Sequence, residues 1–230
     1  LQTISMATFI YGNTQDMSQG WQTPSVSPLV RSKGREKGQK NNSSLSLPVK
    51  GSISYPSVVR RSGEQPGKWV MTLNVTTGGK TKQVTAIADS LGLLKNGINP
   101  FSLANTGEGT KDGLQNYRIT DVIRTAEGYA GAFFDKNGAL ATAHSTDLRS
   151  WSSPQKLDVH SKRGAALAYQ DSVLHLIHLQ NDDLLRHTST IEKGAFSLKD
   201  TMMQANSMET VPDLAFFNHK WHLLKGKANN

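Results

Sequence analysis

The chain has 230 residues, of which 36% are hydrophobic, and it contains 20 glycines, 8 prolines and no cysteine. Disulfides and thiolate metal sites require cysteine, so both are excluded. A single domain of this length is ordinary for an all-β protein. No stretch approaches the ~18 apolar residues of a membrane-spanning helix, and no helical apolar period persists. We therefore expect an all-β fold without membrane insertion.

The net charge is +8, and much of the excess lies in residues 31–40, "RSKGREKGQK". A basic surface can bind nucleic acid, a membrane surface or an acidic glycan. This segment, however, carries no aromatic residue on which a base could stack, and its glycines are typical of a solvated loop. We expect no nucleic-acid partner.

Residues 1–22, "LQTISMATFIYGNTQDMSQGWQ", align with the second half of the repeats described below. In that alignment Thr3 stands where Thr142 stands in a complete copy. Residues 23–52 contain two short apolar segments, "PLVRS" and "SSLSLPVKG", on either side of the basic loop. We interpret this region as a degenerate copy of the same repeat.

Residues 55–94 fit the repeat when four residues are inserted in its first turn, which places Trp69 where Trp221 stands in the last copy. Residues 96–116, "NGINPFSLANTGEGTKDGLQN", form a Gly/Asn-rich excursion before the next copy. It is longer than most connections between strands, which is typical of a functional or mobile loop.

Three segments repeat clearly; they begin at residues 119, 165 and 211, which are 46 residues apart. In each, a short apolar strand is followed at a fixed spacing by a second strand and a polar turn, "DKNG", "QNDD" or "GKANN". The two complete copies continue into a third, alternating strand. Polar turns between alternating strands are typical of hairpins, so each complete copy predicts a three-stranded antiparallel meander.

A period of this length with several short strands per unit is typical of a β-propeller, in which each repeat is one blade. A propeller ring closes when one blade takes strands from both ends of the chain. We expect one five-bladed β-propeller domain, closed by pairing of the N- and C-terminal segments in one blade. The expected blades are 210–230 together with 1–22, then 23–52, 53–112, 117–160 and 163–208.

The repeat length, the aromatic residue in the second strand and the turns "STDLRSW" and "TQDMSQGW" resemble propeller lectins of the tachylectin-2 type. The likeness extends over the architecture of most of the chain. It does not include a lectin motif that matches residue by residue. The turn from Asp147 to Trp151 is also similar to turns of five-bladed propeller glycosidases and to the aspartate boxes of sialidases. In those families the Asp satisfies turn amides and the Trp packs between strands, so the resemblance implies a structural role. A binding role for Asp147 and Trp151 is the alternative.

Sugar binding by a propeller needs an aromatic plate for the pyranose face and polar groups for its hydroxyls. The candidates are the aromatic residues at the repeated position and polar residues of nearby turns, namely Trp69, Tyr129, Trp221, Asn74, Asp135 and Asn181. Aromatic residues at this position are also typical of the core between blades, and this alternative stays open.

Glycoside hydrolysis usually needs two carboxyl groups that face each other across the sugar. Asp121 and Asp213 occupy the same repeat position on the innermost strand, where Ala166 and Ser57 stand in other copies. The resemblance to five-bladed glycosidases implies a Glu general acid, and no Glu occupies an inner-strand position. The alternative is that both Asp side chains bind backbone amides of a neighbouring blade.

The histidines offer no clear metal site. His175 and His178 lie three residues apart on one strand, so they point to opposite faces and do not hold one metal through that strand. We expect no metal and no cofactor.

The main hypothesis from the sequence is a non-catalytic, lectin-like module. It would bind glycans or glycoproteins of a cell surface or matrix and would be secreted or extracellular. The first alternative is a propeller glycoside hydrolase that uses Asp121 and Asp213. The second is a protein-interaction domain that targets a secreted toxin or enzyme. Glycan binding without turnover would favour the lectin-like module, and turnover would favour the hydrolase. Neither binding nor turnover would favour the protein-interaction domain.

Overall fold

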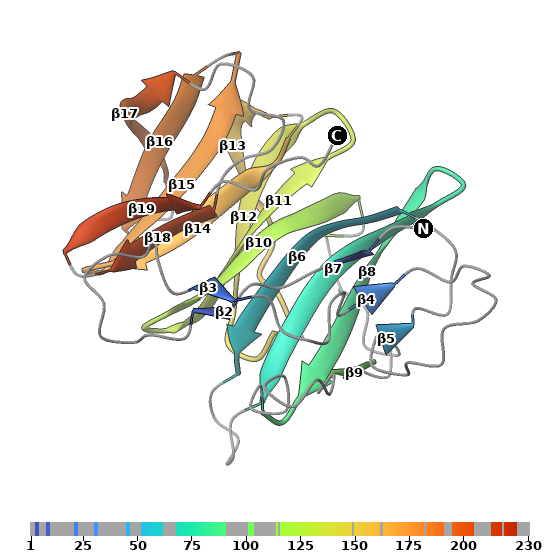
Figure 1. The fold of residues 1–230 in the computed structure, drawn as a ribbon. Coiled ribbons are helices and arrows are strands. Elements are labelled where there is room, and N and C mark those ends of the chain that lie inside the picture. The colour runs from blue at the N-terminus through green and yellow to red at the C-terminus, as the bar shows by residue number, and fades with distance from the viewer. Residues whose placement is uncertain are drawn as a thin grey trace. The chain divides into compact units, whose positions relative to one another are not determined.

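The computed structural model describes residues 3–4, 8–9, 21–22, 30–31, 45–46, 52–61, 68–90, 101–103, 114, 116–148, 150–161, 163–181, 183–190, 195–204, 213–217 and 219–224. Every regular element in these ranges is a β-strand, which confirms the all-β prediction (Figure 1). Within the same ranges no helix has the length and hydropathy needed to cross a membrane. The chain divides into two compact units, 1–107 and 108–230.

The N-terminal unit begins with five two-residue strands: β1 (Thr3–Ile4), β2 (Thr8–Phe9), β3 (Trp21–Gln22), β4 (Val30–Arg31) and β5 (Leu45–Ser46). Strand β1 pairs antiparallel with β4, β4 pairs parallel with β5, and β2 pairs with β3.

The described strands of the N-terminal segment pair within their own unit, with Thr3 opposite Arg31. The ring closure expected from the sequence stays a prediction. The alignment of Thr3 with Thr142 rested on a few alternating residues. So short a pattern carries little information about which partner a strand takes.

The rest of the N-terminal unit is a four-stranded meander of β6 (Ser52–Arg60), β7 (Trp69–Thr77), β8 (Lys80–Ala88) and β9 (Ser102–Leu103). Gly78 and Gly79 join β7 to β8 with φ values of 55° and 77°. Two positive φ values in a two-residue turn match the right-handed twist of the strands, and glycine adopts them without steric cost. Alternate residues of β7, including Met71 and Leu73, form the buried core of this sheet.

The C-terminal unit contains two four-stranded meanders and one hairpin. The first meander is β10 (Tyr117–Thr125), β11 (Gly128–Asp135), β12 (Ala139–Ser145) and β13 (Gln155–His160). The second is β14 (Ala165–Gln170), β15 (Val173–Gln180), β16 (Asp183–Thr190) and β17 (Ser197–Gln204). The hairpin is β18 (Asp213–Phe217) and β19 (Lys220–Leu224).

The repeats therefore fold as meanders, but each complete copy has four strands where the sequence predicted three. The missed strands, β13 and β17, each lie at the edge of a sheet. Their side chains are half-buried or exposed, and they carry charged residues such as Lys156 and Lys199. Charge on an edge strand discourages pairing with other chains, and it also removes the apolar alternation by which a strand is recognised in sequence.

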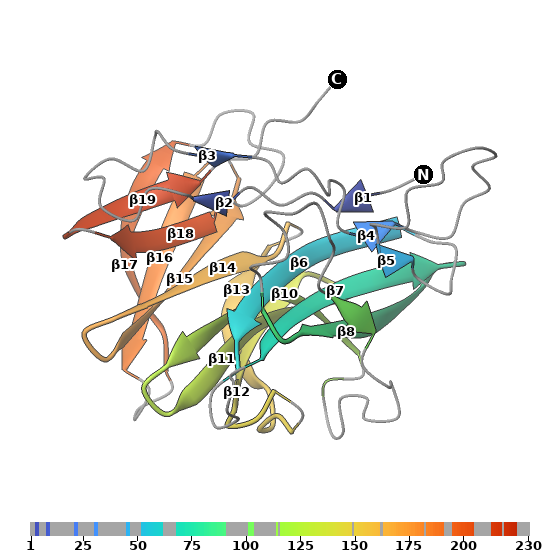
Figure 2. The same ribbon diagram turned by 60° about the horizontal axis from the view of Figure 1, so that its bottom comes forward.

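The first strands of the three sheets lie next to one another. Ala165 of β14 donates its backbone N–H to Thr120 Oγ1 of β10 (3.4 Å), and β14 in turn contacts β18. On that side Ala166 and Ile177 of the second meander pack against Leu214 and Trp221 of the hairpin. Figure 2 shows β14 next to β18. Successive sheets stacked through their first strands are the blade arrangement that the repeat predicts.

Candidate functional site

Asp121 lies on the first strand of its sheet, directly after a bulge in β10. Its Oδ1 accepts the backbone N–H of Val122 at 2.7 Å, and its Oδ2 accepts the backbone N–H of Leu167, on the neighbouring sheet, at 2.8 Å. The carboxylate therefore joins two sheets, as the structural alternative for this residue predicts.

Asp213 is the first residue of β18 and pairs with Leu224. Its side chain lies outside what the structure describes. The second residue of the predicted carboxyl pair is therefore placed by its backbone alone, on the first strand of the hairpin.

The three predicted aromatic plates are packed within the sheets. Tyr129 is 1% exposed, and Trp69 packs against the core of the β6–β9 sheet. The ring centroid of Trp221 lies 4.5 Å from the ring centroid of His175. The guanidinium carbon of Arg186 lies 5.8 Å from the same Trp221 centroid. These contacts are those of aromatic residues in a core between strands, the alternative that the sequence left open.

The predicted polar residues are not brought together with these aromatics. Asn74 is 1% exposed on β7. Asp135 Oδ1 accepts the backbone N–H groups of Asn137 and Ala139 in the turn between β11 and β12. Asn181 is exposed in the next equivalent turn, with a φ of 54°. Tyr129 and Asp135 lie at opposite ends of β11, so they do not share a pocket.

The turn from Asp147 to Trp151 has the structural role that the resemblance implies. Asp147 Oδ1 accepts the backbone N–H of Ser150 at 2.8 Å, and Ser145 Oγ accepts that of Leu148 at 2.8 Å. The Trp151 ring packs edge-on against Phe133, with centroids 5.3 Å apart. Because Leu148 has a φ of 63°, these bonds hold a strained turn in place.

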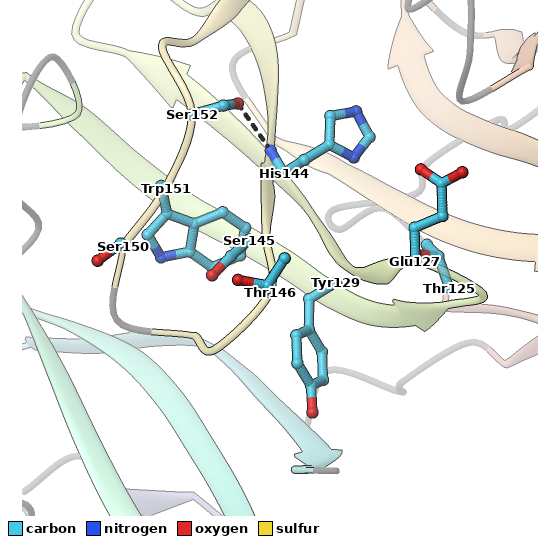
Figure 3. A pocket seen from close by; sticks show the side chains of 9 residues that line it. All are labelled: Thr125, Glu127, Tyr129, His144, Ser145, Thr146, Ser150, Trp151 and Ser152. Carbon is cyan, nitrogen blue, oxygen red and sulfur yellow. Dashed lines mark hydrogen bonds between the residues drawn. The ribbon is translucent and has the colours of Figure 1, made fainter. Parts of the chain in front are cut away.

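Beside this turn the structure shows a hollow of about 380 Å³ that the sequence did not predict (Figure 3). It is lined by Thr125, Glu127, Tyr129, His144, Ser145, Thr146, Ser150, Trp151 and Ser152. Burial lowers the pKa of His144, and the negative charge of Glu127 opposes this shift. Of these residues Tyr129 was a candidate for sugar binding, and Trp151 belongs to the turn "STDLRSW". Glu127 lies in a separate segment that no sequence motif connects to that turn.

Two histidines form a buried pair. The Nε2 atoms of His178 on β15 and His187 on β16 lie 3.0 Å apart, so one ring donates to the other. Burial, with a smaller contribution from the nearby His187, lowers the pKa of His178 to about 4. His175 contacts Trp221 and His178 contacts His187, so their side chains lie on opposite faces, as predicted. Among the residues described, no cluster of three or more His, Asp or Glu side chains is arranged to hold a metal ion.

No protein-family model matches the chain, and no curated protein matches it by sequence. Among solved structures, the chain is similar to the catalytic domain of a GH62 α-L-arabinofuranosidase from Coprinopsis cinerea, with a TM-score of 0.56 and 13% identity over 84% of this chain and 64% of that one. It is also similar to a GH43_1 enzyme from Xanthomonas citri, with a TM-score of 0.53 and 10% identity over 75% of this chain and 62% of that one.

A third similar structure is an α-L-arabinofuranosidase from Podospora anserina in complex with cellotriose, with a TM-score of 0.52 and 12% identity over 80% of this chain and 60% of that one. The chain spans less than two thirds of the length of each of these proteins. Identities this low establish a likeness of fold alone. Of the two likenesses drawn from the sequence, the fold thus supports the glycosidase likeness over the lectin one: this is a propeller-like arrangement of antiparallel sheets shared with glycoside hydrolases.

Proposed function

We propose that the chain is the propeller of a carbohydrate-active protein and that its activity is glycoside hydrolysis. The observation that carries the proposal is the likeness of fold to glycoside hydrolases over 84% of this chain, together with an aspartate on the first strand of two of its sheets. A repeat of 46 residues also divides the chain into five, so we infer five blades. Because the polysaccharide substrates of glycoside hydrolases commonly lie outside the cell, we infer that the protein is secreted.

The two aspartates would divide the chemistry between them. Asp121 is already held by two backbone N–H donors, 2.7 and 2.8 Å from its oxygens. Such a carboxylate is oriented and acts as an acceptor, which suits the base or nucleophile of glycoside hydrolysis rather than the acid. Asp213 would then protonate the leaving oxygen. The separation of the two carboxyl groups would decide between retention and inversion.

The substrate class follows from the similar proteins. Two of them are α-L-arabinofuranosidases, and the GH43_1 enzyme was also solved with xylotriose. We therefore infer a plant-cell-wall type of substrate, an arabinose- or xylose-containing glycan.

A non-catalytic glycan-binding module is the second candidate, and one observation favours it. None of the first strands β6, β10, β14 and β18 carries a glutamate, the general acid expected of five-bladed glycosidases. A chain without a competent acid would keep the propeller and its glycan contacts but lose turnover.

The test is hydrolysis of 4-nitrophenyl α-L-arabinofuranoside, xylotriose and arabinoxylan by the wild-type chain, by Asp213→Asn and by Asp121→Asn. We expect turnover by wild type and a loss of 100-fold or more, about 3 kcal/mol of barrier, in each variant. Asp158→Asn, an exposed residue on β13, is the matched control and should keep wild-type turnover. Binding of arabinoxylan without turnover would favour the second candidate, and neither binding nor turnover would refute both.

A further inference from the structure

The hollow beside the Asp147–Trp151 turn is a separate feature from the first-strand aspartates. It lies where β10 turns into β11 and where β12 ends, whereas Asp121 is in the middle of β10, about 13 Å back along the strand from Thr125. We propose that this hollow is a saccharide-binding site that takes one or two sugar residues. The proposal does not rest on the catalytic function proposed above.

The walls of the hollow are held rigidly by hydrogen bonds. Ser152 donates its backbone N–H to the His144 carbonyl oxygen (2.8 Å), and His144 donates its backbone N–H to Ser152 Oγ (3.0 Å; Figure 3). Trp151 is 8% exposed and is fixed against Phe133. A site whose walls are already ordered spends little conformational entropy on binding, which matters for a ligand with few contacts.

The β10–β11 turn forms the other side of the hollow, and its position depends on a glycine. Gly128 has a φ of 142°, and a Cβ atom there would lie 2.4 Å from the Ser145 carbonyl oxygen. Only glycine allows so close an approach in this backbone conformation. It brings the β10–β11 turn against the end of β12 and so holds Glu127, which is exposed, at the rim beside His144. In Figure 3 the two side chains extend in the same general direction.

The chemistry of the lining is that of a sugar site. Hydroxyl groups come from Thr125, Thr146, Ser150 and Ser152, and Glu127 supplies a carboxylate that can accept two neighbouring sugar hydroxyls. Trp151, which is 8% exposed, adds an apolar side chain to the lining. A volume of about 380 Å³ is at the small end of ligand pockets, which limits the occupant to one or two rings.

Other ligands fit less well. Glu127 is the single formally charged side chain among the described residues that line the hollow, so an anion would be repelled. Glu127 and His144 are two candidate metal ligands, fewer than the three or four that protein sites for Zn²⁺ usually provide. An apolar ligand would leave the hydroxyl and carboxylate groups desolvated and unpaired.

The experiment is a titration of the full chain with L-arabinose, D-xylose, D-galactose, methyl α-D-mannoside and xylobiose, followed by saturation-transfer NMR and calorimetry. We expect at least one of them to bind, and Glu127→Gln to weaken that binding about ten-fold or more, because a charge-assisted hydrogen bond is replaced by a neutral one. The matched control is Asp171→Asn, which makes the same charge change in the equivalent hairpin turn of the next sheet, outside the hollow. This control should bind like wild type.

The proposal is overturned if no saccharide of the panel binds, if Glu127→Gln binds as well as wild type, or if Asp171→Asn weakens binding equally. A Glu127-dependent signal from inorganic phosphate or Ca²⁺ in place of the sugars would also overturn it. The titration measures binding alone, whereas the catalytic proposal is tested by turnover in Asp121→Asn and Asp213→Asn. Failure of this site is thereby distinguishable from failure of the proposed catalytic function.

Discussion

The carboxylate of Asp121 and the backbone amide of Leu167 are joined by a hydrogen bond of 2.8 Å between residues 46 positions apart, which is the length of one repeat. The bond joins the first strands of consecutive sheets, β10 and β14. Asp121 thus attaches its own sheet to the next one, whether or not it also acts on a ligand.

Replacement of Asp121 should weaken this attachment in a graded way. Asp121→Ala removes the acceptors of two backbone N–H groups, Val122 and Leu167, and should lower the free energy of unfolding by about 2–3 kcal/mol. Asp121→Asn keeps one acceptor oxygen and should lose about half as much. Urea denaturation followed by circular dichroism measures both, and Asp158→Asn should unfold like wild type. A stability of Asp121→Ala equal to wild type would show that the bond contributes nothing to the fold.

The buried pair of His178 and His187 should make the protein sensitive to mild acid. The pKa of His178 is about 4 in the folded chain against an ordinary value of 6.5, so between these values the unfolded chain binds more protons. The stability associated with the neutral pair is complete above about pH 6.5 and is lost as the pH falls toward 4. The loss should be on the order of 3 kcal/mol.

This pH dependence can be assigned to the pair by comparing variants. In His178→Leu/His187→Leu the two buried rings are replaced together, so neither is left without its partner, and the decline in melting temperature between pH 6.5 and 4 should be shallower than in wild type. His160→Gln, at an exposed position of β13, should keep the wild-type decline. Equal declines in the double variant and in wild type would place the acid sensitivity elsewhere.

Gly128 should be much less tolerant of alanine than Gly78. Both have positive φ values, 142° and 55°, but a Cβ at Gly128 would meet the Ser145 carbonyl oxygen at 2.4 Å, whereas nothing lies within 4 Å at Gly78. Gly78→Ala should therefore cost about 1 kcal/mol, the conformational strain alone. Gly128→Ala should cost at least about 2 kcal/mol, because backbone must also shift.

Thermal unfolding of the two glycine variants measures this difference. A drop in melting temperature for Gly128→Ala no larger than for Gly78→Ala would mean that the β10–β11 turn and the end of β12 do not lie as closely together as the structure has them. Such a result would also remove one wall of the proposed saccharide site.

Local features of the sequence were sufficient for the first three strands of each complete repeat and for the turns between them. The hairpin turns at "DKNG" and "QNDD" and the strands on either side of them were predicted because a turn depends on residues within a few positions, such as Asp135 accepting the N–H groups of Asn137 and Ala139. The 46-residue period predicted repeated sheets for the same reason, since each copy carries its own alternation and its own turn.

The candidate site was predicted only in part. The sequence singled out Asp121 by its repeat position, and the structure places it between two sheets. Tyr129 was a candidate for stacking on a sugar, with packing in the core as the alternative, and it is 1% exposed. An aromatic ring in a central strand is covered by whatever sheet lies against it. Glu127 and His144 drew no attention, since a turn residue and a strand-end residue 17 positions apart form a site only when the sheet brings their segments together.

What the sequence alone determined was thus the alternation of strands and turns, their repetition and the all-β class, all of which depend on neighbours along the chain. Only the tertiary structure decided the edge strands β13 and β17, the pairing of Thr3 with Arg31, the bond from Asp121 to Leu167 and the hollow beside Trp151. Each of these depends on which segments, distant in sequence, are packed against one another. That packing is decided by the burial of side chains over whole sheets, which no local pattern contains.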